Sequence, residues 1–176
     1  MTKGDSLRFE IMFGPQCAGK TTLAHSDEFI NYNYVSLGEQ VRSTPLESEL
    51  SKRASELIRL AKPWPAELGM QFIQDAILRA NDNGKHILLD GYPRHQDELE
   101  EIDEFIKEKE VQPITAILEV TANKEILLRR YLDRDGRGEN LDFYHLRYRQ
   151  YEEFKEIAER YALQKGIEYR VVNTTS

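Results

Sequence analysis

The chain has 176 residues, and its 24 basic and 31 acidic side chains give it a formal charge of −7 at neutral pH. Apolar residues make up 40% and charged residues 31%, which predicts one globular domain over residues 1–176 with a real hydrophobic core. The negative charge argues against a protein that mainly holds a nucleic-acid backbone, because that task needs a broad basic surface. No apolar run reaches the roughly 18 residues of a membrane span, and residues 1–13 lack the pattern of a secretory leader. The single cysteine, Cys17, excludes an internal disulfide framework, which agrees with a reducing compartment. Together these features predict a cytoplasmic protein that binds neither nucleic acid nor membrane.

Short β-branched runs alternate with longer helical patterns, and this alternation predicts βαβ units that form a parallel sheet. In chain order, strands are expected at residues 8–13, around 34–37, and at 86–90, 114–120 and 169–173. Helices are expected at residues 46–61, 65–81, 96–110, 123–134 and 141–165. Gly84, Pro113 and Gly166 mark boundaries between these elements. The expected class is therefore α/β with a five-stranded parallel sheet.

The strongest local signal lies directly after the first expected strand. Residues 14–22 read Gly-Pro-Gln-Cys-Ala-Gly-Lys-Thr-Thr, which fits the phosphate-loop pattern G-x-x-x-x-G-K-[ST] between a strand and a helix. Backbone N–H groups in such a loop form an anion nest, and the helix N-terminus adds a favourable dipole. Lys20 is expected to bridge the β and γ phosphates of a nucleoside triphosphate, while the Thr21 hydroxyl binds Mg²⁺ and Thr22 can share that role. The residues expected to bind this donor are Gly14, Cys17, Ala18, Gly19, Lys20, Thr21 and Thr22.

Cys17 lies inside this loop and has two interpretations. A thiol at a helix N-terminus is more readily oxidised, which would make Cys17 a regulatory switch. The simpler interpretation is a small residue that fills the loop and directs its backbone N–H toward phosphate.

Three further segments carry a resemblance to a known family. Residues 35–42, Val-Ser-Leu-Gly-Glu-Gln-Val-Arg, resemble the S-T-G-D-x-x-R stretch of adenylate kinases, and residues 90–94, Asp-Gly-Tyr-Pro-Arg, reproduce their D-G-[FY]-P-R motif. The spacing of four arginines is similar to that of the family's lid arginines, namely Arg130, Arg134, Arg137 and Arg147. The sequence is therefore identified as a member of the adenylate kinase family of nucleoside monophosphate kinases, which includes the UMP/CMP kinases.

The resemblance implies a P-loop three-layer fold with two inserts. A helical monophosphate-binding insert would cover about residues 37–65, and a short lid would cover about residues 135–140. Residues 135–140 contain no cysteine and leave no room for a zinc-binding insertion, so no structural metal is expected there.

The resemblance also implies roles for charged residues. Arg42 and Arg94 would hold the acceptor phosphate beside Gly91, and Asp90 would hold Mg²⁺ together with Thr21. The residues that would act on the transferring phosphoryl group are Lys20, Arg94, Arg130, Arg134, Arg137 and Arg147, of which Arg130 would also contact the donor. This set suits phosphoryl transfer, because the reaction needs fixed positive charge and a guanidinium group pairs with phosphate through two hydrogen bonds.

Three residues leave the acceptor base open. Leu37 stands where adenylate kinases have a threonine and Glu98 where they have a glutamine, and both positions help to read the base. Glu98 would favour a base that presents an amino or imino donor, or it is a solvated helix residue that Gln96 replaces in this role. Trp64 either stacks on the acceptor base or wedges a loop between two helices.

The sequence thus predicts an enzyme that acts as a monomer and transfers the γ-phosphoryl group of Mg·ATP to AMP or a pyrimidine monophosphate. Because the chain ends at Ser176, soon after the last expected strand, loose selectivity for the donor base is expected. The altered base-reading residues favour, as an alternative, a catalytically weak nucleotide-binding sensor. A P-loop kinase of another small metabolite is the third hypothesis.

Overall fold

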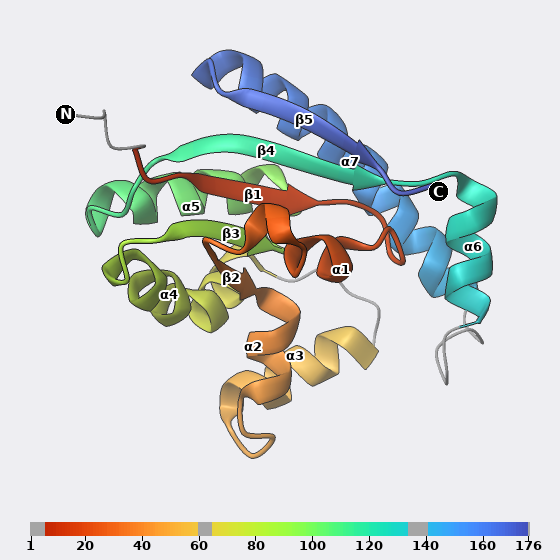
Figure 1. Ribbon diagram of the computed structural model, residues 1–176. Coiled ribbons are helices and arrows are strands. Elements are labelled where there is room, and N and C mark those ends of the chain that lie inside the picture. Colours follow the sequence, from red (N-terminus) through yellow and green to blue (C-terminus); the bar gives the residue numbers. More distant parts are fainter. Residues whose placement is uncertain (1–5, 60–64, 134–140, 176) are drawn as a thin grey trace.

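The computed structural model describes residues 6–59, 65–133 and 141–175. Its centre is a five-stranded sheet in the order β2-β3-β1-β4-β5, in which every neighbouring pair is parallel (Figure 1). The strands are β1 (Phe9–Phe13), β2 (Tyr32–Ser36), β3 (His86–Asp90), β4 (Ile114–Thr121) and β5 (Glu168–Asn173). All five residues of β1 are buried, as expected for a central parallel strand covered on both faces. The expected α/β class with a five-stranded parallel sheet is confirmed.

The helices connect and cover these strands. They are α1 (Lys20–Ala24), α2 (Leu37–Ser43), α3 (Glu49–Arg59), α4 (Ala66–Asp82), α5 (Gln96–Glu108), α6 (Lys124–Leu132) and α7 (Leu141–Lys165), and a 3₁₀ turn, η1, covers Asp27–Phe29. Most boundaries lie within three residues of the expected ones. The expected helix at 46–61 begins at Glu49, because residues 44–48 form a turn.

Helix α2 was not predicted, since the sequence places Leu37 at the end of a strand. In the structure β2 ends at Ser36, whose hydroxyl accepts a hydrogen bond from the backbone N–H of Glu39 and caps the new helix. Helices α2 and α3 project together away from the sheet (Figure 1). They are the described part of the expected insert at 37–65.

The two faces of the sheet bury different helices. Phe9 and Ile11 of β1 pack in a cluster with residues of α2, α4 and α5, whereas Met12 packs on the opposite face with residues of α1 and α6. Phe13 packs against Phe154 of α7, with ring centroids 5.1 Å apart. This alternation along one strand produces the three-layer arrangement.

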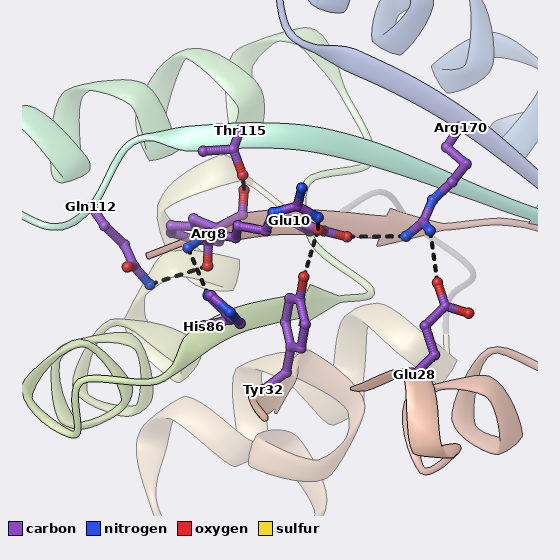
Figure 2. Close-up of polar contacts among 9 residues, drawn as sticks. Arg8, Glu10, Glu28, Tyr32, His86, Gln112, Thr115 and Arg170 are labelled. Atoms are coloured by element: carbon purple, nitrogen blue, oxygen red, sulfur yellow. Dashed lines mark hydrogen bonds and ion pairs between the residues drawn. The ribbon is translucent and has the colours of Figure 1, made fainter. Parts of the chain in front are cut away.

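A polar layer covers the amino-terminal part of the sheet face that carries Met12 (Figure 2). Glu10 of β1 is only 1% exposed, and its Oε1 accepts a hydrogen bond of 2.7 Å from the Tyr32 hydroxyl. The guanidinium groups of Arg8 and Arg170 each lie 3.4 Å from the same carboxylate. The buried charge is therefore paired and hydrogen-bonded, which is the condition for keeping it in a core.

Among the helices of the described ranges, none is both long and apolar enough to cross a bilayer.

Candidate active site

The loop after β1 has the backbone that the phosphate-loop pattern requires. Gly14 has φ of 154°, and a Cβ atom at this position would lie 1.9 Å from the Val120 carbonyl oxygen, so only glycine fits between β1 and β4. Gly19, with φ of 87°, precedes the first residue of α1. The ammonium group of Lys20 donates hydrogen bonds to the carbonyl oxygens of Gly14 at 2.9 Å and Pro15 at 3.0 Å. The lysine therefore lies over the loop whose N–H groups would bind phosphate.

Two residues far along the chain support this loop from behind. The Thr174 hydroxyl donates to the Ala18 carbonyl oxygen at 2.8 Å. Arg130 of α6 donates to the Thr174 carbonyl oxygen at 2.9 Å and to the Cys17 carbonyl oxygen at 3.4 Å. These hydrogen bonds hold the Cys17 and Ala18 carbonyl groups. They therefore fix the orientation of the peptide planes in the loop whose N–H groups would bind phosphate. No sequence pattern indicates a role for Thr174, which follows the last strand in an ordinary Asn-Thr-Thr stretch.

A cavity of about 190 Å³ opens in front of the loop. It is lined by Phe13, Gly14, Gln16, Lys20, Gly91, Pro93, Arg94, Arg147, Gln150, Tyr151 and Phe154. The cavity thus joins the phosphate loop to the Asp-Gly-Tyr-Pro-Arg motif and to one face of α7. Five residues of the expected site meet there, namely Gly14, Lys20, Gly91, Arg94 and Arg147.

The two arginines of the cavity repel each other. Burial lowers the pKa of Arg94, an effect that Glu98 and Asp90 partly offset. Burial and, after it, repulsion from Arg94 lower the pKa of Arg147 to about 10, while Glu98 opposes this shift. Arg147 therefore keeps its charge at neutral pH. An anion that entered the cavity would relieve the repulsion and the lost solvation together.

The motif that carries Arg94 is anchored by its tyrosine. The Tyr92 side chain is fully buried, and its hydroxyl donates to Glu101 of α5 at 2.7 Å. A Cβ atom at Gly69 of α4 would lie 2.5 Å from the Tyr92 ring, so the glycine allows the ring to pack against the helix. This anchoring fixes the backbone two residues before Arg94.

Glu98 is buried at the start of α5, with only 3% exposure. Its Oε2 accepts a hydrogen bond of 2.5 Å from the Arg94 backbone N–H, so the carboxylate acts as a helix cap. Burial raises the pKa of Glu98 to about 7, and the hydrogen bonds from the Arg94 and His95 backbone oppose this rise. The burial of this side chain argues against the interpretation of Glu98 as a solvated helix residue.

Only some of the remaining residues expected to bind the acceptor nucleotide lie close together. A side chain at Gly91 would reach within 3.4 Å of Arg94 Nη2 and 3.7 Å of Leu37 Cβ, so these three residues are neighbours. Arg42 is exposed on α2, with Nη1 near Gly38. Three further expected site residues, Trp64, Arg134 and Arg137, lie outside the described residues.

Asp90 ends β3 beside the start of the loop, since its register partner on β1 is Met12. Its Oδ2 accepts a hydrogen bond of 2.7 Å from the Tyr34 hydroxyl, while its Oδ1 is buried and has no hydrogen-bond partner among the described residues. The Thr21 side chain at the start of α1 is exposed, as is that of Thr22. A buried carboxylate oxygen that lacks a donor fits the hard oxygen ligands that Mg²⁺ prefers, either directly or through water, and the Thr21 hydroxyl at the start of α1 would add a second such ligand.

A parallel sheet, a strand–loop–helix phosphate site and a cavity with two partly buried arginines together define a P-loop phosphotransferase. The family model for adenylate kinase matches residues 12–166, and the chain belongs to the adenylate kinase family. The expected family and fold class are confirmed.

Three relatives illustrate this membership. The chain is 31% identical over 151 residues to the adenylate kinase of Flavobacterium johnsoniae, which covers 83% of this chain and 78% of the relative. It is 28% identical over 166 residues to the adenylate kinase of Nitratiruptor sp., which covers 89% and 82%. It is 31% identical over 112 residues to adenylate kinase isoenzyme 1 of Gallus gallus, which covers 63% of this chain and 55% of the relative. The chain is therefore similar to adenylate kinases of bacterial and vertebrate origin.

Proposed function

We propose that the chain transfers the γ-phosphoryl group of Mg·ATP to a nucleoside monophosphate and so produces two diphosphates. The observation that supports this most is the composition of one cavity. Its wall contains the phosphate-loop residues Gly14 and Lys20 on one side and Gly91 and Arg94 on another. A donor on the loop and an acceptor phosphate at Arg94 would meet in this space, and Arg147 faces it as well.

Each charged residue has a task in this reaction. Lys20 would exchange its contacts with the loop carbonyl oxygens for the β and γ phosphates of the donor. Arg94 would hold the acceptor phosphate, and Arg147 would stabilise the charge that develops on the transferring group. Arg130 would act through the loop that it supports, and Arg42 would reach the acceptor phosphate from the insert. Magnesium held by Asp90 and Thr21 would neutralise phosphate charge.

The aromatic part of the wall serves a second purpose. Phe13, Tyr151 and Phe154 line the cavity together with its polar groups. Apolar rings exclude water from the reacting phosphoryl group, which favours transfer over hydrolysis. Residues 135–140 are proposed as the lid that completes this exclusion, with Arg134 directly before it and Arg137 within it.

The acceptor is proposed to be AMP or a pyrimidine monophosphate. Leu37 lies beside Gly91 and Arg94, close to where the base would follow the acceptor phosphate. Glu98 keeps acceptor capacity on its carboxylate beyond the hydrogen bonds from the Arg94 and His95 backbone, and it would accept from an amino group of the base.

The test is a steady-state assay with Mg·ATP in which AMP, CMP, UMP, GMP and their deoxy forms are offered separately and diphosphates are detected directly. Turnover with AMP or a pyrimidine monophosphate is expected. Arg147→Gln should lower kcat/KM with the best acceptor by about 100-fold or more, because it removes a charge from the transition state. The control is Arg149→Gln, an exposed position on the same helix, which should stay within twofold of the wild type.

The contrary outcomes separate the alternatives. ATP binding without turnover on any monophosphate would favour the nucleotide sensor or a kinase of another small metabolite. Equal activity of the Arg147→Gln and wild-type proteins would show that the reaction does not take place in this cavity.

A further inference from the structure

Two tyrosines on β2 make parallel contacts with buried carboxylates. Tyr32 and Tyr34 are two residues apart and therefore project from the same face of the sheet. Tyr32 donates to Glu10 of β1, the contact at the centre of the polar layer in Figure 2. Tyr34 donates to Asp90 of β3, and the oxygen–oxygen distance is 2.7 Å in both contacts. The contacts are chemically alike, but Tyr32 begins β2 and Tyr34 lies at its middle, closer to the carboxyl end of the strand.

The surroundings of the two carboxylates differ. Glu10 is also approached by the guanidinium groups of Arg8 and Arg170, so its charge is neutralised inside the fold. Asp90 has no ion pair among the described residues, and its Oδ1 is buried without a hydrogen-bond donor there. A buried carboxylate oxygen without a donor costs free energy, so the fold tolerates it only where another group supplies the missing contact.

The Tyr34 side chain is fixed where it meets the phosphate loop. Its ring packs edge-on against that of His25 at 5.4 Å between centroids, and His25 Nδ1 is 2.7 Å from the Thr21 carbonyl oxygen. The Tyr34 hydroxyl also interacts with the side chains of Thr21 and Ser36. One phenol therefore links the carboxyl end of β3 to the first turn of α1.

We propose that Tyr34 is a positioning residue of the magnesium site: its hydroxyl holds Oδ2 of Asp90 and so keeps Oδ1 available to the ion that accompanies ATP. A carboxylate released from this contact would rotate and pair with other donors. In this role Tyr34 acts on the ion through Asp90 and does not itself contact the phosphates. The inference rests on the proposed function, because it requires that ATP binds with Mg²⁺ at the loop.

The test compares Tyr34→Phe with Tyr32→Phe as a matched control, since each variant removes one hydroxyl from a buried carboxylate. ATP binding is measured by calorimetry in Mg²⁺ and again in EDTA. The Kd in EDTA divided by the Kd in Mg²⁺ reports how much the ion contributes to ATP affinity. Tyr34→Phe should reduce this ratio by about tenfold, the usual effect of losing a residue that orients a metal ligand, and leave Kd in EDTA within twofold of the wild type. Tyr32→Phe should leave both values unchanged.

A second readout does not depend on calorimetry. Mn²⁺ replaces Mg²⁺, and its affinity for the ATP-saturated protein is measured by electron paramagnetic resonance. Tyr34→Phe should weaken Mn²⁺ binding by about tenfold, and Tyr32→Phe should not.

Three outcomes would count against the inference. An unchanged ratio in Tyr34→Phe would show that the hydroxyl only satisfies Asp90 and does not prepare the ion site. An equal loss of ATP affinity in Mg²⁺ and in EDTA would show a general effect on the loop. Absence of ATP binding by the wild-type chain in either condition would overturn the proposed function itself, and the inference with it.

Discussion

Two neighbouring carboxylates at the start of α5 differ in burial and therefore in charge behaviour. Asp97 and Glu98 are neighbours in the first turn of α5, yet Asp97 is exposed while Glu98 is almost fully enclosed. Enclosure raises the pKa of Glu98 to about 7 despite the hydrogen bonds it accepts from the backbone. A side chain with such a pKa changes its charge in the range where the protein would work.

The pKa of Glu98 predicts a pH dependence of stability. The folded state raises this pKa from 4.5 to about 7, so folding favours the protonated carboxyl. The ionised form therefore destabilises the fold, and this effect develops as pH rises from about 4.5 to about 7. Glu98→Gln keeps an acceptor for the Arg94 N–H and removes the charge, so its stability relative to the wild type should increase over that range by up to about 3 kcal/mol.

The measurement is urea unfolding of both proteins at pH 5, 6, 7 and 8. A stability difference between them that does not change with pH would contradict the raised pKa. Asp97→Asn serves as the control, because this exposed neighbour should show no comparable trend.

At the scale of elements, one buried carboxylate holds α7 against the sheet. Glu119 of β4 is fully buried and accepts hydrogen bonds from Tyr151 of α7 and, at 2.7 Å, from Tyr169 of β5. The ammonium group of Lys155 lies 3.3 Å from the same side chain. Since Tyr151 also lines the cavity, this contact connects the packing of α7 to the wall of the site.

Tyr169→Phe should reduce the free energy of unfolding by about 1–2 kcal/mol, because it leaves an acceptor of a fully buried carboxylate without its donor. Tyr161→Phe provides a comparison. Its hydroxyl donates to Asp103, whose side chain is 20% exposed and can bind water in place of the tyrosine. The loss measured by urea unfolding should be clearly smaller for Tyr161→Phe, and equal losses would show that the burial of Glu119 has no special weight.

At the scale of the whole molecule, an acidic protein keeps its site cationic. The formal charge of the chain is −7, while Lys20, Arg94 and Arg147 line one cavity. The repulsion and lost solvation of the two arginines are costs that the free protein bears and that a polyanion removes. Stability and function therefore oppose each other at this point of the fold.

Inorganic tripolyphosphate tests this opposition without a nucleotide base. At about 100 times its Kd it should stabilise the wild type by about 2.7 kcal/mol, which corresponds to a rise in Tm of roughly 5–10 °C for a chain of this length. Arg147→Gln should raise the Tm of the ligand-free protein and lose most of the shift with tripolyphosphate, whereas Arg149→Gln should behave as the wild type. If Arg147→Gln lowers the Tm of the ligand-free protein, repulsion between Arg94 and Arg147 does not destabilise the fold.

Much of the fold followed from local patterns. The buried run of β1 and the long periodic helix over Leu141–Lys165 were predicted because burial on one or both faces leaves a clear trace in residue order. Helix α2 was not predicted because Leu37 continues an apolar strand pattern. Only the cap formed by Ser36 ends the strand before Leu37. A helix of one or two turns has too little periodicity to be recognised in a sequence.

The sequence by itself determined the phosphate loop, the Asp-Gly-Tyr-Pro-Arg motif and the family, because these depend on residue types at fixed short spacings. Only the tertiary structure decided which distant residues complete the site. Thr174 reaches the loop from the far end of the chain, and Tyr34 of β2 meets Asp90 of the neighbouring strand β3, 56 residues further along the chain. The reason is physical: a hydrogen bond between residues far apart in sequence follows from how strands are ordered in the sheet, and no local pattern records that order.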